Sequence, residues 1–492
     1  MTMTSVQLPC IARCAALLAV LLLVPACATN PVTGSNDFVL MSEDQEIALG
    51  RKANALVLKE TPVYEDPKLE QLVQQVGEKL ASHSHRPELF YRFTVLDSTA
   101  INAFALPGGY IYITRGMLAY LNSEAELAAV LGHEIGHVTA RHSVRQQSTA
   151  AVTGILSAVV AASTGVQGVD TLTDMASTAI VRGYGRDHEL EADRLGAEYL
   201  AKSGYDPNAM LEVVGILKNQ EAFETMVAEK EGREANVYHG LFSTHPDNDA
   251  RFQEVVHAAQ LYRTGTTSRI NRDSFLHTLD GLTFGDSERE GIIRGNHFYH
   301  KPLDFKVTFP ENWRIENSTD RILAESPDND GLIQMSITDL NKRITPEQFM
   351  EQRMRLKNLR QGSSFKTGDL EGYTAIADSN TTFGTRAVRY VVLYRDTSAY
   401  IFAGTARNSK DSRRFDSDIL STARSLHGLN VADKQYAREK KLAIIRAPGG
   451  TSYTGLAARS PITNYPEIQL RLLNDAYPDG EPVASQLIKV VH

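Results

Sequence analysis

The chain has 492 residues, more than one hydrophobic core usually organises, so we expect several domains. Hydrophobic residues make up 42% of the chain and charged residues 22%, a composition typical of ordinary globular protein. The formal net charge of -8 gives no basis for a nucleic-acid partner, and we expect none.

The first predicted element is a signal peptide over residues 1–26. Arg13 precedes an apolar run that ends at Val24, and small residues then lead to Cys27. This run is too short to span a bilayer, which requires about 20 apolar residues. All three cysteines of the chain lie in this region, so no intrachain disulfide can join the folded domains: Cys10, Cys14 and Cys27.

A cysteine directly after such a run resembles a bacterial lipobox, in which cleavage frees Cys27 for acylation. Pro25 stands where Ala or Ser is usual, and a plain signal peptide cut near Ala26 or Ala28 is the alternative. Ala28 is also not the Asp that acts as a retention signal. The expected location is therefore the cell envelope, in the periplasm, with a lipid anchor at Cys27 in the outer membrane.

The next predicted elements are two helices and a small sheet. Apolar residues at three- and four-residue spacing predict helices that begin near Ser42 and Asp66. Three short strand patterns follow, and a Pro-Gly-Gly turn separates the last two. These strands are Phe93–Leu96, Asn102–Ala105 and Tyr110–Thr114.

A well-marked helix follows the sheet. Ser123 and Glu126 have the spacing of a capping box, and an apolar helical stripe continues from Leu127 to Val138. A second helix is predicted from His188 to Lys202, because Gly204 soon after it is typical of a helix end.

The first of these helices carries His133, Glu134 and His137. Histidines four residues apart project from one helix face, which lets two imidazoles bind one zinc ion. Glu134 lies beside that face, where it can take a proton from the attacking water and return it to the leaving amine. Two solvated surface histidines are the alternative. The motif predicts a hydrolytic centre with one Zn2+ per chain.

A catalytic zinc ion normally has three protein ligands, and two glutamates compete for the third position. Glu189 and Asp193 share a helix face, whereas Glu191 is turned by roughly 200° from Glu189 at about 100° per residue. If Glu189 binds the metal, Asp193 can accept the free ring N–H of a histidine ligand and fix its orientation. We therefore favour Glu189, and a charged, solvent-facing helix is the alternative.

These residues resemble the gluzincin zinc metallopeptidases of the CAAX prenyl endopeptidase, HtpX-like and BepA-like type, in their bacterial lipoprotein branch. The resemblance implies a mostly helical zincin-type metallopeptidase domain with a small β-sheet over residues 27–265. In that family the first glutamate of the Glu-x-x-Ala-Asp segment binds zinc, which agrees with the choice of Glu189. The resemblance covers roughly residues 30–260 and depends on Asn102 to Gly109, His133-Glu134-Ile135-Gly136-His137, Arg141-His142 and Glu189-Leu190-Glu191-Ala192-Asp193.

The resemblance implies two further features. The strand Ala103, Phe104, Ala105 is expected to pair with the main chain of a substrate, as an exposed sheet edge can. A buried structural hairpin is the alternative. His245, in a Thr-His-Pro-Asp segment followed by Arg251, resembles the family's His-Pro loop, whose histidine approaches the metal. Either water or His245 then fills the fourth zinc position.

The segment from Ser148 to Val169 carries no charge and is long enough to cross a bilayer. A single span there would leave His137 and Glu189 on opposite sides of the membrane, where no zinc site could close. We therefore predict a helical hairpin that packs on the protein or skims the membrane. Two nearby histidines, His142 and His188, are expected either beside the ligands or on the surface.

The C-terminal half changes to alternating strand patterns, with helical stretches at residues 346–359 and 413–426. We predict a linker at 266–295 and an α+β accessory domain at 296–430, which is either a peptide-binding platform or a structural part. Residues 437–492 resemble a small LysM-like module, a peptidoglycan-binding fold, and a structural cap is the alternative. The fold class of the whole chain is thus α+β.

The expected function is hydrolysis of peptide bonds in misfolded or unassembled cell-envelope proteins, with Glu134 as general base. The alternative is a zinc-containing peptide-binding assembly factor or chaperone that cleaves little. Intact Glu134 favours the enzyme, because a binding module needs no proton carrier at that position.

Overall fold

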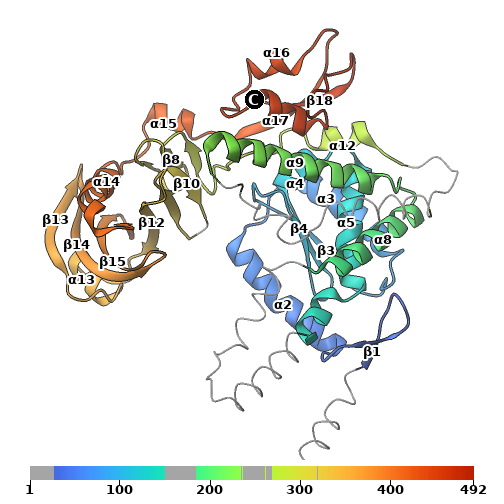
Figure 1. Cartoon of the computed structure of the whole chain (residues 1–492), viewed down its shortest axis with the longest axis horizontal. Helices are drawn as coiled ribbons and strands as arrows, with labels where there is room; N and C mark the ends of the chain where they lie inside the picture. The colour runs from blue at the N-terminus through green and yellow to red at the C-terminus, as the bar shows by residue number, and fades with distance from the viewer. Residues whose placement is uncertain (1–26, 150–183, 234, 236–260, 262–268, 319) are drawn as a thin grey trace, which may run out of the picture. The chain divides into compact units, whose positions relative to one another are not determined.

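The computed structural model describes residues 27–149, 184–233, 235, 261, 269–318 and 320–492. The chain divides into two compact units (Figure 1). The first unit combines Met1–Leu282 with Lys441–His492, and the second is Thr283–Lys440. Helices and strands occur in both units, which confirms the expected mixed α and β class.

In the first unit, two helices and a three-stranded sheet precede the helix that bears the histidine pair. Helix α2 (Glu43–Glu60) begins after Ser42 and α3 (Pro67–Ala81) after Asp66, as predicted, and the side chains of Ser42 and Asp66 cap their helices. The strands are β3 (Arg92–Leu96), β4 (Ala103–Leu106) and β5 (Tyr110–Thr114). A separate two-stranded pair consists of β1 (Cys27–Thr29) and β2 (Asn36–Phe38).

The position of β4 in its sheet matters for the site. The strand order is β3-β5-β4, with β3 parallel and β4 antiparallel to β5. Among the residues described, β4 is therefore an edge strand. It also packs against α5 (Glu124–Thr139), the helix of the histidine pair. An edge strand beside that helix can offer its free main-chain groups to another extended chain.

Helix α5 is the centre of the first unit. All of its residues are buried, and α8 (Arg186–Lys202) and α9 (Ala209–Glu231) pack against it. A Cβ added at Gly136 would lie 3.0 Å from the carbonyl oxygen of Ala192, and one at Gly196 would lie 3.1 Å from the backbone nitrogen of His133. Because such contacts are tighter than normal van der Waals packing, the glycines allow α5 and α8 to approach closely.

The N-terminus of α5 differs in detail from the predicted capping box. The Ser123 hydroxyl accepts the Glu126 N–H at 3.1 Å, as expected. The Glu126 carboxylate, however, accepts the N–H of Asn122 at 2.7 Å and the hydroxyl of Ser123 at 3.0 Å, rather than the N–H of Ser123. The Glu126 carboxylate thus bonds one residue further back along the chain than in a capping box, and both it and the Ser123 hydroxyl have hydrogen-bond partners.

The C-terminal residues pack on the same unit. They contain β17 (Lys440–Arg446), α16 (Tyr453–Ala457), α17 (Pro466–Leu473) and β18 (Leu487–Val491), with β17 and β18 antiparallel. Lys489 in β18 is 0% exposed, and its Nζ donates to the carbonyl oxygens of Ala119 and Leu121, both at 2.7 Å. Those carbonyls lie at the end of α4 (Arg115–Tyr120). The segment expected as a small module thus shares a compact unit with the histidine helix from Lys441 onward.

The second unit is built on a seven-stranded antiparallel sheet with the order β10-β11-β12-β16-β15-β14-β13. Helices α14 (Ser412–Arg424) and α13 (Pro346–Gln352) cover opposite faces, since Phe415 packs with Phe402 and Phe349 packs with Val392. Trp313, the only tryptophan, is buried in the core beside α14. The strands are β10 (Arg314–Asn317), β11 (Ile322–Glu325), β12 (Gly331–Asp339), β13 (Arg360–Thr367), β14 (Leu370–Thr381), β15 (Gly384–Arg395) and β16 (Ser398–Ala406).

Two segments differ from the predicted pattern. The helix expected over 346–359 ends at Gln352, and the positive φ angles of Arg355 (58°) and Asn358 (53°) show that the chain turns there. The segment expected as a linker, 266–295, contains regular elements: α12 (Arg272–Thr278), β6 (Thr283–Phe284) and β7 (Ile292–Arg294). The remaining elements are β8 (His297–His300), β9 (Phe305–Thr308), a short 3-10 helix (Ser409–Asp411) and α15 (Val431–Tyr436).

In the described parts of the chain, no helix has both the length and the apolar character that crossing a bilayer requires. The predicted signal peptide over 1–26 lies outside the described residues, as does all but the first two residues of the predicted Ser148–Val169 hairpin.

The buried contacts of Lys489 predict a stability effect. Lys489→Met keeps most of the side-chain volume but leaves two buried carbonyl oxygens without their donor, so we expect a loss of about 2–4 kcal/mol. Urea unfolding followed by far-UV circular dichroism measures this loss, with the exposed Lys59→Met as control. Trp313 fluorescence reports on the second unit and should change less. A midpoint equal to that of Lys59→Met would refute the anchoring role.

Candidate metal centre

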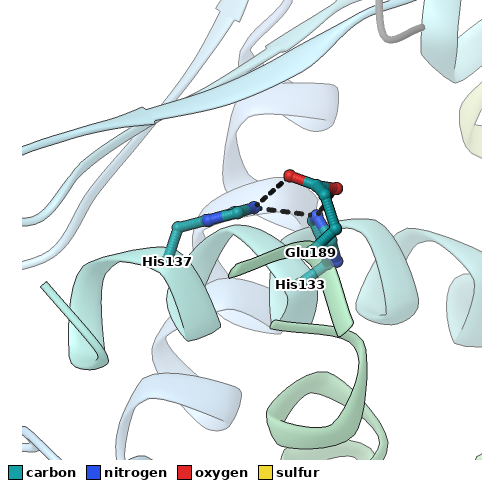
Figure 2. A group of neighbouring side chains, drawn as sticks. All are labelled: His133, His137 and Glu189. Atoms are coloured by element: carbon teal, nitrogen blue, oxygen red, sulfur yellow. Dashed lines mark hydrogen bonds and ion pairs between the residues drawn. The ribbon is translucent and has the colours of Figure 1, made fainter. Parts of the chain in front are cut away.

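Three predicted ligands meet between α5 and α8 (Figure 2). One nitrogen from each of His133 and His137 and one carboxylate oxygen of Glu189 lie within 4.8 Å of one another, and all three residues are buried. The two Nε2 atoms are 3.0 Å apart. Oε2 of Glu189 lies 3.5 Å from Nε2 of His133, and Oε1 of Glu189 lies 3.5 Å from Nε2 of His137.

These separations fit one tetrahedral metal ion. Zinc bonds imidazole nitrogen and carboxylate oxygen at about 2.0–2.2 Å, so tetrahedral ligands are separated by roughly 3.4 Å. The two nitrogens are 3.0 Å apart, and each lies 3.5 Å from one oxygen of the Glu189 carboxylate, so these separations are close to that value. Two imidazoles and one carboxylate also suit zinc better than hard ions such as magnesium. Three protein donors would leave a fourth position open.

Asp193 lies one helical turn beyond Glu189, as its predicted supporting role requires. Its Oδ1 is 2.8 Å from Nδ1 of His133, and its side chain is fully buried. A hydrogen bond from Nδ1–H of His133 to this carboxylate leaves the Nε2 lone pair directed at the metal position.

The second histidine is held by a different chain of contacts. Nδ1 of His137 lies 2.8 Å from Nδ1 of His142, whose Nε2 lies 3.1 Å from the Glu191 carboxylate. Arg145 donates to the same carboxylate oxygen at 3.0 Å. If His142 is neutral, it donates from Nε2 to Glu191 and accepts from Nδ1–H of His137, so Nε2 of His137 carries the lone pair that can bind a metal.

The charges around this chain support the neutral form of His142. Burial lowers the pKa of His142, which favours the uncharged ring. The hydrogen bond from His142, helped by Arg145, lowers the pKa of Glu191 to about 2, so that this carboxylate stays ionised as an acceptor. Burial also lowers the pKa of the adjacent His188, to about 4.

From the sequence, Glu191 is predicted only as a rival ligand, and His142 is predicted either beside the ligands or on the surface. Glu191 faces away from Glu189 on α8, and there its carboxylate contacts His142, the residue that supports His137. The Arg141-His142 pair soon after the second ligand was the available signal for this contact.

Tyr184 is a site residue that sequence reasoning missed. Its ring stacks on that of His137 at 3.9 Å with an interplanar angle of 17°, and its hydroxyl lies 2.6 Å from Ser143 Oγ. Burial, with smaller contributions from Glu134 and Glu189, raises the pKa of Tyr184. The hydroxyl therefore stays protonated. Tyr184 precedes α8 and belongs to no periodic pattern, so no local pattern indicated its role.

A buried ion-pair network fixes the chain just beyond the histidine pair. Glu46 on α2 accepts from Arg86 and from Arg141, each at 2.8 Å, and all three side chains are nearly inaccessible to solvent. Arg141 adopts a positive φ of 55°. An unpaired buried charge is costly, so removing any one of these three side chains would leave a buried charge without its partner. The ion pair between Glu46 and Arg141 also connects α2 to the end of α5.

The remaining predicted site residues are distributed as follows. Glu134 lies on α5 next to His133 and is 0% exposed. Ala103, Phe104 and Ala105 form most of the edge strand β4. His245 and Arg251 lie outside the described residues, so their predicted proximity to the metal stays a prediction.

The chain is similar in sequence to known peptidases over part of its length. Residues 67–259 match peptidase family M48. The chain is 29% identical over 256 residues to the beta-barrel assembly-enhancing protease of Yersinia pestis, covering 50% of each protein. It is 30% identical over 244 residues to the protein of the same name from Escherichia coli strain K12, covering 48% of each. It is 29% identical over 166 residues to the metalloprotease YcaL of Escherichia coli, covering 33% of this chain and 60% of that one.

The chain therefore spans about half the length of the beta-barrel assembly-enhancing proteases that it matches. The matched family and the cluster of His133, His137 and Glu189 agree on zinc as the cofactor. The match also includes both helices that supply these donors.

The geometry predicts graded losses of zinc affinity. Glu189→Ala removes a ligand and should abolish stoichiometric binding, whereas Glu191→Ala and Asp193→Ala remove supports and should weaken binding about 10–100-fold. Competition with a chromophoric chelator measures each affinity. Asp187→Ala, an exposed carboxylate on the same helix, is the control and should bind as the wild type does. Normal affinity in Glu189→Ala with loss in Glu191→Ala would reverse the assignment of the ligand.

Proposed function

Residues 67–259 are a peptidase family M48 domain, and on that premise we propose that the chain is a zinc metalloendopeptidase of the cell envelope. The observation that carries the proposal is the buried cluster of His133, His137 and Glu189, with Glu134 on the same helix as the two histidines. The proposed substrates are misfolded or unassembled envelope proteins.

In the proposed mechanism, bound zinc supplies a Lewis acid that polarises the peptide carbonyl and favours deprotonation of the attacking water. Glu134 takes the proton from this water and returns it to the leaving amine. Its burial keeps the carboxylate away from bulk solvent. Asp193 and His142 hold the two ligand histidines in the tautomer that presents Nε2, so the site needs little rearrangement during turnover.

We propose that β4 pairs with the main chain of the substrate. Residue Asn102, just before β4, accepts the N–H of Thr114 at 3.0 Å, so alternate residues of β4 bond to β5. This alternation directs the N–H and C=O groups of Ala103 and Ala105 away from β5, to the edge of the sheet where no described strand pairs with β4. A substrate strand bound there would lie beside α5, against which β4 packs.

The proposed substrate class rests on similarity to proteins named beta-barrel assembly-enhancing protease. Those proteins match over about half of their length. A peptide-binding assembly factor with little proteolysis remains the second candidate, because it would use the same fold and the same ligands. Buried Glu134 favours the enzyme.

The proposed location is the periplasm, with a lipid anchor at Cys27 in the outer membrane. Entry of radiolabelled palmitate into the wild type but not into Cys27→Ala would support the anchor, and labelling of both would remove it. For residues 437–492 we propose peptidoglycan binding. Failure of the full chain to sediment with peptidoglycan would remove this proposal. We expect no nucleic-acid partner.

The role of Glu134 predicts a separation between metal binding and turnover. Glu134→Gln removes the proton carrier but none of the three donors, so we expect normal zinc content and hydrolysis of unfolded β-casein that is about 100-fold slower or more. Equal hydrolysis by wild type and variant would contradict the mechanism. Zinc-loaded wild type without any hydrolysis would instead favour the assembly factor.

Pairing with β4 predicts an alternating dependence on the substrate main chain. N-methylation of a peptide substrate, one position at a time, removes one N–H donor and should reduce kcat/KM roughly 5–10-fold at two positions separated by one residue. The intervening position faces away from β4 and serves as the internal control. A uniform response, or a response only at the cleaved bond, would exclude strand pairing at this edge.

A further inference from the structure

The second unit contains a cavity of about 650 Å3 at one end of its seven-stranded sheet. Several strand ends and turns meet there: the start of β10, the turn between β11 and β12, the turn between β14 and β15, and the end of β16. The charged and aromatic side chains that line it include Arg314, Glu325, Asn329, Phe383, Arg386 and Arg407. We call this cavity the arginine pocket. Loops held by a rigid sheet are common locations for binding sites.

Contacts to the backbone hold two of these arginines in place. Arg386 donates from Nε to the carbonyl oxygen of Arg407 and from Nη1 to that of Thr385, both at 2.9 Å. Arg407 donates from Nε to the carbonyl oxygen of Asn329 at 3.2 Å, and its guanidinium lies 5.0 Å from the ring centre of Phe383. Because each guanidinium is already oriented, a ligand that binds them loses less side-chain freedom.

These two arginines differ from the third in their charge partners. Arg314 forms ion pairs with Glu316 and Glu325. Within the described part of the chain, no Asp or Glu side chain forms an ion pair with Arg386 or Arg407. The lining therefore carries three positive charges and one negative charge, an excess of two positive charges. The whole chain, by contrast, has a net charge of -8.

We propose that the arginine pocket binds a carboxylate of a peptide, from an Asp or Glu side chain or from a peptide C-terminus. A guanidinium offers paired N–H groups in a plane, which match the two oxygens of a carboxylate. Among the described residues, none accepts a hydrogen bond from an Nη group of Arg407. Phe383 is partly buried and adds an apolar wall for the stem of the ligand side chain.

A peptide fits the lining better than a phosphate group does. A phosphate group would place up to two negative charges on one centre beside Glu325, whereas a carboxylate places only one, and Glu325 can accept an N–H from a peptide main chain. Asn329 can both donate to and accept from an amide. A cavity of about 650 Å3 is also large enough for a few residues of an extended segment. The second unit would thus select acidic segments of other proteins, whether or not the first unit cleaves them.

The test uses the full chain carrying Glu134→Gln, so that proteolysis does not remove the probe. The probe is a fluorescein-labelled peptide of Gly, Ser and four Glu residues, and binding is followed by fluorescence anisotropy. Arg386→Gln combined with Arg407→Gln should weaken binding about 10-fold or more. The control combines Lys342→Gln with Arg343→Gln, which removes the same amount of charge beyond the opposite end of β12. This control should change the affinity for the probe less than about 2-fold.

Further arms separate the sources of the carboxylate and exclude other ligands. Replacing Glu by Gln in the probe tests side-chain carboxylates, and amidation of its end tests the C-terminus; one of these changes must weaken binding. Arg386→Lys combined with Arg407→Lys keeps the positive charges but removes the paired, planar N–H groups, so it should still weaken binding. Trp313 fluorescence checks that each variant is folded.

Three results would overturn the proposal. They are equal weakening by the Arg386/Arg407 and Lys342/Arg343 pairs, unchanged binding in the Arg386/Arg407 variant, and displacement of the probe by inorganic phosphate more readily than by unlabelled acidic peptide. The last result would assign the pocket to phosphate groups instead. None of these outcomes depends on whether the first unit is a peptidase.

Discussion

The close approach of α5 and α8 is the constraint on which the metal centre depends. Two donors come from α5 and the third from α8, and a metal ion requires all three within about 2 Å of one point. Gly136 and Gly196 make this approach sterically possible, because a Cβ at either position would press on the backbone of the other helix. A larger residue there would separate the donors, even though neither glycine contacts the metal position.

Burial of the site couples metal binding to folding. Glu134, Glu189 and Asp193 are all inaccessible to solvent, and burying three carboxylates without a compensating cation would be strongly unfavourable. A divalent cation would supply that compensation, so bound zinc should stabilise the folded chain. The supports on the two histidines differ: a carboxylate on His133, and a histidine with a carboxylate behind it on His137.

Local patterns predicted the local parts of the structure. Helical phase brought Glu189 and Asp193 to one face, apolar spacing predicted where α2 and α3 begin, and a capping pattern predicted the start of α5. Contacts between distant segments could not be read in this way. The bonds from Lys489 to Ala119 and Leu121 join residues about 370 positions apart, and no periodicity records such a pairing. The stacking of Tyr184 on His137 and the positioning of Glu191 likewise depend on tertiary packing.

The most direct test of the account is a crystal structure of the zinc-loaded chain with anomalous diffraction recorded at the zinc absorption edge. The account predicts one strong anomalous peak, about 2.0–2.2 Å from Nε2 of His133, Nε2 of His137 and a carboxylate oxygen of Glu189. A peak bonded to Glu191 instead, or zinc bound away from α5, would contradict it.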